Sequence, residues 1–376
     1  MRKAVYLLII GVSIISCSNE GDRYTFVYEN YGVQEPEIID MDKDIVDLSP
    51  NDFEFFISQS GQDYEIGNGN FLEAINDSIL VVVRQKTLLK KINLYSGVIE
   101  DEKRYEGNGP GEYNQIDNIV RTDSSLLAID RQMGKLIEYN FDLEHKKDIM
   151  LDNTDLLNPF SNMAYHASRY YYPIRQNENF LFSQADIEKD SLTHSLFHKR
   201  FIPVGKQPRL YNEYLIDASK EGILLTSVRM PLFFMYDQNL NLQNLYKLGS
   251  STIDKVGNSS DNRGGIDKTS SGTILNPPPK VLEEENRDVS FNGFAIADAV
   301  YADDKIFIYF SNRYIEDRYL ITLKKEGSTW VHSGSYRFVK DDGELFTVFD
   351  LAYSDPWLYL SSQFEEGIIR INTEEL

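Results

Sequence analysis

The residues with the clearest chemical pattern are five arginines that each follow a short apolar run, as in residues 79–84. They are Arg84, Arg131, Arg175, Arg229 and Arg313. Because a guanidinium binds a carboxylate or sulfate through two parallel hydrogen bonds, arginines gathered on one rim would suit an anionic glycan or an anionic protein surface. The chain also has 59 acidic residues, so the alternative is that each arginine pairs with a neighbouring acid and stiffens a turn.

The spacing of these arginines predicts a structural repeat. Successive copies lie about 44 to 54 residues apart, except for about 84 residues between Arg229 and Arg313, and a sixth copy ends in Gln363. Further runs of Val, Ile, Tyr and Phe flank each copy and are broken by Asp, Asn, Ser and Gly, which is typical of strands and turns. The sequence therefore predicts an all-β fold over residues 50–376, a six-bladed β-propeller of four-stranded antiparallel blades.

Two irregularities of the repeat have structural explanations. The long interval contains residues 252–288, which are rich in Ser, Gly, Asn and Asp and predict a long loop, with a degenerate seventh blade as the alternative. The sixth unit has only three strands before the end of the chain at Leu376. Since an open blade edge invites aggregation, we expect the apolar run at residues 53–57 to supply the fourth strand and close the ring.

The blade geometry predicts where the function lies. In a four-stranded blade, the turn between strands 2 and 3 lies on the same face as the link to the next blade. The arginines and the long loop would share that face. A rival hypothesis is an enzyme with a polar or metal site on the propeller axis. Residues expected near the starts of the inner strands are its candidates, and they are Glu73, His166, Glu213 and Asp350.

A glycine-rich motif follows the third strand of the first unit, and it reads Gly107-Asn108-Gly109-Pro110-Gly111-Glu112-Tyr113. No helical pattern follows it, so a turn between blades is favoured over a phosphate-binding loop. The motif resembles the Gly-x-Gly-Pro-Gly-Glu-Tyr or Phe signature of six-bladed β-propeller lipoproteins common in Bacteroidota, which are similar in fold to NHL and TolB-like propellers. The resemblance covers about residues 50–376 and implies a fold and an exported location more than an activity.

The single cysteine, Cys17, stands at the end of an apolar N-terminal run that begins after Arg2 and Lys3. That run is shorter than the roughly 20 residues of a membrane-spanning helix. It resembles a bacterial lipoprotein signal, in which residues 1–16 are removed and Cys17 becomes the lipidated N-terminus. Residues 17–49 would then be a lipid-anchored tether. By the same resemblance, Ser18 indicates the outer membrane, on its periplasmic or cell-surface face.

Composition excludes several functions. The net charge of −21 argues against nucleic acid as a partner, and one cysteine excludes a disulfide framework or a multi-thiolate zinc site. The aspartates at 40, 42 and 44 lack the glycine and glutamate of a calcium loop, and the histidines at 194 and 198 lack the glutamate of a zinc protease helix. We therefore predict no cofactor, although an axial calcium or zinc ion would be compatible with the fold. The sequence predicts a non-catalytic binding or scaffold module, with a lactonase, lyase or glycosidase-like enzyme as the alternative.

Overall fold

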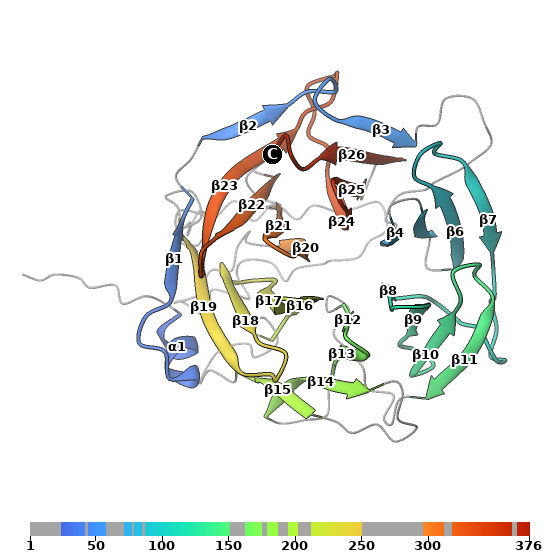
Figure 1. Cartoon of the computed structure of the whole chain (residues 1–376), viewed down its shortest axis with the longest axis horizontal. Coiled ribbons are helices and arrows are strands. Elements are labelled where there is room, and N and C mark those ends of the chain that lie inside the picture. Colours follow the sequence, from blue (N-terminus) through green and yellow to red (C-terminus); the bar gives the residue numbers. More distant parts are fainter. Residues whose placement is uncertain are drawn as a thin grey trace, which may run out of the picture.

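The computed structural model describes residues 24–41, 44–57, 71–76, 79–84, 87–150, 162–174, 179–186, 195–201, 212–249, 296–311, 318–362 and 367–376. In these ranges the chain forms six β-sheets arranged as blades around a central axis, so the predicted propeller is confirmed (Figure 1). The predicted loop at 252–288 and the predicted lipidation site Cys17 lie outside the described residues.

The first three blades each have four antiparallel strands in sequence order from the axis outward. Blade 1 contains β4 (Phe71–Asn76), β5 (Ile79–Arg84), β6 (Leu88–Asn93) and β7 (Ile99–Lys103). Blade 2 contains β8 (Asn118–Arg121), β9 (Leu126–Asp130), β10 (Lys135–Tyr139) and β11 (His145–Met150). Blade 3 contains β12 (Ala164–His166), β13 (Arg169–Pro173), β14 (Phe180–Asp186) and β15 (Ser195–Lys199).

The last three blades are completed by the N-terminal part of the chain. Blade 4 contains β16 (Tyr214–Ser219), β17 (Gly222–Ser227), β18 (Leu232–Tyr236) and β19 (Leu242–Gly249), and β1 (Glu37–Asp40) pairs with β19 in parallel. Blade 5 contains β20 (Ile296–Ala302), β21 (Lys305–Ser311), β22 (Arg318–Glu326) and β23 (Thr329–Phe338), and β2 (Ile45–Leu48) pairs with β23 in parallel. Blade 6 contains β24 (Val348–Ser354), β25 (Trp357–Ser362) and β26 (Ile368–Asn372).

The sixth blade is closed by β3 (Glu54–Ile57), which pairs antiparallel with β26. The ring therefore joins the two ends of the chain, as the apolar run at residues 53–57 predicted. Backbone hydrogen bonds between β3 and β26 leave blade 6 with four strands like its neighbours.

The N-terminal strap, residues 24–57, follows the outside of the ring from α1 (Thr25–Tyr31) to β3 (Figure 1). Part of the range predicted as a tether is thus packed on the propeller. The reason is that Tyr24, Val27 and Tyr28 are apolar side chains, and all three are buried with Phe197 and other residues of blades 3 and 4. The described residues include no helix that is long and apolar enough to cross a membrane.

Burial follows the position of each strand in its blade. Middle strands such as β9 and β17 are buried along their whole length because both faces of the sheet pack on neighbouring blades. The outer strand β11 is mostly exposed. Apolar clusters fill the spaces between blades, and one of them joins Val81 and Leu89 of blade 1 with Leu126 and Ile137 of blade 2. This packing fixes the inner strands around the axis.

Candidate functional site

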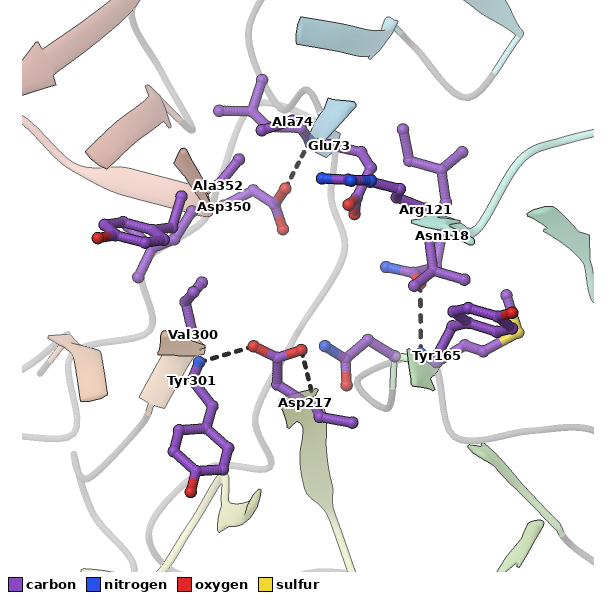
Figure 2. A pocket seen from close by; sticks show the side chains of 18 of the residues that line it. Glu73, Ala74, Asn118, Arg121, Tyr165, Asp217, Val300, Tyr301, Asp350 and Ala352 are labelled. Carbon is purple, nitrogen blue, oxygen red and sulfur yellow. Dashed lines mark hydrogen bonds between the residues drawn. The ribbon is translucent and has the colours of Figure 1, made fainter. Parts of the chain in front are cut away.

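A pocket of about 300 Å³ lies on the axis, and the inner strands of all six blades contribute to its wall. Figure 2 shows polar side chains from different blades turned toward this space. The lining extends to Asp123 in the turn after β8 and to His166 at the end of β12. The pocket therefore reaches the carboxyl ends of inner strands, where strand 1 turns into strand 2.

Three aspartates in the wall each bind the backbone of the next blade. Asp217 Oδ2 accepts the N–H of Tyr301 at 2.6 Å, and Asp298 Oδ2 accepts the N–H of Leu351 at 2.7 Å. The third, on β24, closes the ring to blade 1, since its Oδ2 accepts the N–H of Leu72 at 2.6 Å (Figure 2). Each carboxylate thus holds two neighbouring inner strands together.

The same arrangement continues with other polar residues at the remaining three blade boundaries. Asn162 Oδ1 accepts the N–H of Ile216 at 2.6 Å, and Asn118 Oδ1 accepts the N–H of Met163 at 3.2 Å. Glu73 accepts a hydrogen bond from the backbone of Arg121. All six blade boundaries therefore carry one side-chain-to-backbone hydrogen bond at the axis, and we call these six acceptors the axial clasp.

Four members of the axial clasp are carboxyl groups in a space that is poorly hydrated. Loss of hydration raises the pKa of Glu73 to about 8, and the nearby charges of Asp217 and Asp298 add to the effect. The same burial raises the pKa of Asp217 to about 6 and that of Asp298 to about 7. The pKa of Asp350 is also raised well above its ordinary value, by burial and by Asp298, to which its side chain is hydrogen bonded. Near neutral pH the pocket therefore holds protonated as well as ionised carboxyl groups.

Two further residues give the pocket hydrogen-bond donors. Arg121 is exposed at the end of β8, and its charge opposes the rise in the pKa of Glu73 (Figure 2). Burial lowers the pKa of His166, which favours the neutral form of its imidazole. Among the described residues, no group of three or more His, Cys, Asp or Glu side chains could hold a metal ion.

The predicted arginine rim is only partly described. Arg131 follows β9 and its Nε lies 4.0 Å from Asp117, while Arg229 follows β17 and its Nε lies 3.2 Å from Glu213. Burial lowers the pKa of Arg131. Arg84 ends β5, but its side chain lies outside the described part of the structure. The remaining two arginines, at 175 and 313, lie outside the described residues.

The two described arginines are not in the axial pocket. They stand where strand 2 ends, beside the starts of the inner strands, because Asp117 and Glu213 directly precede β8 and β16. The pocket extends toward the other ends of those strands. These two ion pairs match the alternative hypothesis, in which each arginine pairs with a neighbouring acidic residue.

Three of the four axial candidates named from the sequence line the pocket, namely Glu73, His166 and Asp350. Glu213 does not, because it is buried against Arg229. Sequence reasoning missed Asp217 and Asp298. The available signal was an aspartate between apolar residues in the middle of an inner strand, as in residues 216–218 and 297–299.

The glycine-rich motif lies between β7 and β8, at the boundary of blades 1 and 2, and outside the pocket. Glu112 accepts the N–H of Gly109 at 2.7 Å, and Tyr139 donates to the carbonyl of Gly111 at 2.7 Å. The fully buried Tyr113 donates to the carbonyl of Thr87 at 2.8 Å. Gly111 has a φ of 73°, which favours glycine. In these residues the motif has a structural role in joining two blades.

The fold and the axial site define the class of this protein, a six-bladed β-propeller. A family model described as a 6-bladed β-propeller matches residues 29–212, from within α1 to the end of the link after blade 3. The resemblance to six-bladed β-propellers is confirmed by this match, and the solved structures below with a TM-score of 0.50 or more share the fold.

Solved structures share this fold at low sequence identity. A protein described as exported, from Bacteroides fragilis, is 10% identical with a TM-score of 0.53, over 89% of this chain and 98% of that chain. The WD40 repeats of RRP9 are 10% identical with a TM-score of 0.50, over 86% of this chain and 98% of that chain. A member of the DUF4221 family from Bacteroides vulgatus is 10% identical with a TM-score of 0.46, over 83% and 94%. No curated protein matches the sequence.

Proposed function

We propose that this chain is an exported lipoprotein, anchored at the outer membrane through Cys17, that binds a small polyhydroxylated ligand such as a short glycan in its axial pocket without transforming it. The signal-like segment before Cys17 supports the anchor. The fold of the exported Bacteroides fragilis protein is consistent with an exported location.

The observation that carries the binding proposal is the convergence of all six inner strands on one polar cavity. Its volume of about 300 Å³ is at the lower end of the range for small-molecule sites, so it suits a small ligand. Protonated carboxyl groups donate hydrogen bonds and ionised ones accept them, and Arg121 adds further donors. Hydroxyl groups, which both donate and accept, are complementary to such a wall.

The same carboxyl groups make a neutral ligand a better occupant of this pocket than an anionic one. An acidic glycan would place a negative charge beside Glu73 and Asp217, which repel each other's charge already. An anionic glycan or protein bound at the five arginines remains a prediction. It would have to compete with Asp117 and Glu213 for two of them.

A second candidate is an enzyme, and one observation favours it. Asp298 and Asp350 are hydrogen bonded to each other in the pocket wall. Asp298 raises the pKa of Asp350, whereas the hydrogen bond from Asp350 lowers the pKa of Asp298, so a shared proton belongs mainly to Asp350. Two carboxyl groups that share one proton can act as acid and base in hydrolysis or elimination. Asp298 and Asp350 would then be the proton-transfer residues on a bound glycan.

Calorimetric titration with neutral and acidic oligosaccharides tests the binding proposal. Arg121→Ala and His166→Ala remove lining side chains without removing an acceptor of the axial clasp, so they should weaken binding and leave the folded state intact. Lys340→Ala is the matched control, because Lys340 lies between β23 and β24 and is not in the pocket wall. Equal affinity in all three variants would refute the axial site. Conversion of the sugar, lost in Asp350→Asn, would establish the enzyme instead.

A further inference from the structure

The first described residues of the chain lie at the outer edge of the propeller, between blades 3 and 4. Tyr24 is 5% exposed and packs in the apolar cluster that contains Phe197 of β15 and Leu245 of β19. The ammonium group of Lys247 lies 5.7 Å from the centre of the Tyr24 ring. Residue 24 is thus held to the rim of the ring, away from the axis (Figure 1).

The other end of α1 is held to the same edge by polar contacts. Tyr31 Oη lies 2.8 Å from Nδ1 of His198 and accepts the N–H of Lys199 at 2.9 Å. Lys199 Nζ donates to the carbonyl of Asn30 at 2.8 Å. With both ends fixed and Val27 fully buried between them, α1 is an integral part of the edge.

Cys17 lies seven positions before Tyr24 in the sequence. A fully extended chain covers at most about 3.6 Å per residue, so the lipidated residue lies within about 25 Å of Tyr24. This limit comes from covalent geometry alone and holds for any path of those residues. The tether is therefore much shorter than the predicted range of 17–49 implied.

From this limit we propose an interaction surface, the anchored edge, formed by the outer sides of α1, β1 and β15. This edge faces a phospholipid bilayer, while the opposite edge, at blades 6 and 1, points away from it. The inference rests on the proposed lipid anchor at Cys17. Side chains for contact are present, since Ile38 on β1 is 68% exposed and Leu196 on β15 is 40% exposed. This edge carries the acidic Glu29 and Glu37 together with the basic Lys199 and Lys247. Such a mixture has no basic excess to attract anionic lipid, so the probe surface is a neutral bilayer.

The orientation has a consequence for ligand access. The anchored edge is on the circumference of the ring, so an edge-on propeller keeps both of its faces in solution. The mouth of the axial pocket then stays open to a soluble glycan.

The test measures how close two labelled positions come to a membrane. Ile38 is 68% exposed on the anchored edge, and Tyr95 is 73% exposed in the turn between β6 and β7 of blade 1, across the ring (Figure 1). Ile38→Cys and Tyr95→Cys are therefore a matched pair. Because Cys17 is the single cysteine and its sulfur carries the lipid in the mature protein, a thiol-reactive fluorophore marks only the introduced residue.

Each labelled lipoprotein is reconstituted on neutral phosphatidylcholine vesicles that contain nitroxide lipids. We expect quenching at position 38 to be several-fold stronger than at position 95. Insertion of a Gly-Ser segment of about 40 residues between Cys17 and Tyr24 should remove most of that difference, because the tether then reaches well beyond the ring edge.

Two other outcomes are informative, one against the orientation and one against the anchor. Equal quenching at positions 38 and 95, or stronger quenching at 95, would refute the edge-on orientation while leaving the anchor intact. Vesicle binding that persists in Cys17→Ala would refute the lipid anchor on which the orientation rests.

Discussion

Replacing Glu73 by glutamine should make the protein more stable at neutral pH. Glutamine keeps an oxygen of the same reach, so the hydrogen bond from the backbone of Arg121 can persist. At pH 7 Glu73 must take up a proton on folding, because burial and the neighbouring Asp217 disfavour its charge, and glutamine removes this cost because it is neutral in both states. Glu73→Gln is thus a nearly isosteric change that isolates the electrostatic strain of the axial clasp.

The size of the effect follows from the change in pKa. The pKa of Glu73 rises from 4.5 to about 8 in the folded protein. Each pKa unit corresponds to about 1.4 kcal/mol. Glu73 therefore lowers the free energy of unfolding by about 5 kcal/mol at high pH, and about 3 kcal/mol of this loss is present at pH 7. The folded state binds this proton more tightly than the unfolded state. The contribution of Glu73 to stability is therefore complete below pH 4.5 and is lost progressively as the pH rises to about 8.

Urea unfolding at pH 5 and at pH 7 measures this contribution. We expect Glu73→Gln to exceed the wild type in unfolding free energy by about 3 kcal/mol at pH 7 and by less than about 1 kcal/mol at pH 5. Glu213→Gln is the control, since Glu213 is a buried glutamate whose charge is matched by Arg229. That variant should lose about 3 kcal/mol at pH 7 because it leaves the guanidinium without its partner.

Two results would refute this reasoning. One is a wild type and a Glu73→Gln variant with the same dependence of stability on pH. The other is a Glu73→Gln variant less stable than the wild type at pH 7, which would mean that Glu73 is ionised and satisfied in the folded protein.

Three further changes test other parts of the fold. Tyr31→Phe should lose about 1 to 2 kcal/mol, because Nδ1 of His198 and the N–H of Lys199 lose the hydroxyl group, and it should speed proteolysis of the strap; unchanged proteolysis would contradict the fixed position of α1. Gly111→Ala should be strongly destabilising in thermal unfolding, because its φ is 73° and a Cβ would lie 2.6 Å from Cγ of His145, and a melting temperature equal to the wild type would disprove this. Glu54→Ala should change the unfolding free energy by less than about 1 kcal/mol, since its ion pair with Arg370 is exposed on the Glu54 side and the backbone bonds of β3 close the ring; a larger loss would show that this ion pair holds the closure.

The sequence allowed the architecture to be predicted because each blade repeats one apolar run with a polar residue at its end. Arg131 and Arg229 each follow strand 2 of a blade, as the spacing predicted. The closing strand was predictable from the missing fourth strand of blade 6. The parallel strands β1 and β2 were not, because they are short, carry acids and add to outer edges of blades that were already complete.

The site was harder to predict than the fold because strands 1 and 2 of a blade are antiparallel and end on opposite faces of the ring. A residue pattern at strand ends does not say which of the two faces binds a ligand. The arginine pattern was prominent in the sequence, yet its two described members pair with acids that directly precede the inner strands. Asp217 and Asp298 are single acids inside apolar strands, and only the closed ring brings them to one cavity. Their role depends on backbone N–H groups of the next blade, which no linear pattern reveals.

Hydrogen–deuterium exchange with and without a bound oligosaccharide tests the central claim most directly, because it reports which part of the ring the ligand covers. We predict slower exchange in the inner strands β4, β8, β12, β16, β20 and β24, with little change elsewhere. Slower exchange confined to residues 131–134 and 228–231, where the described arginines end strand 2, would contradict an axial ligand site and place the ligand on the opposite rim.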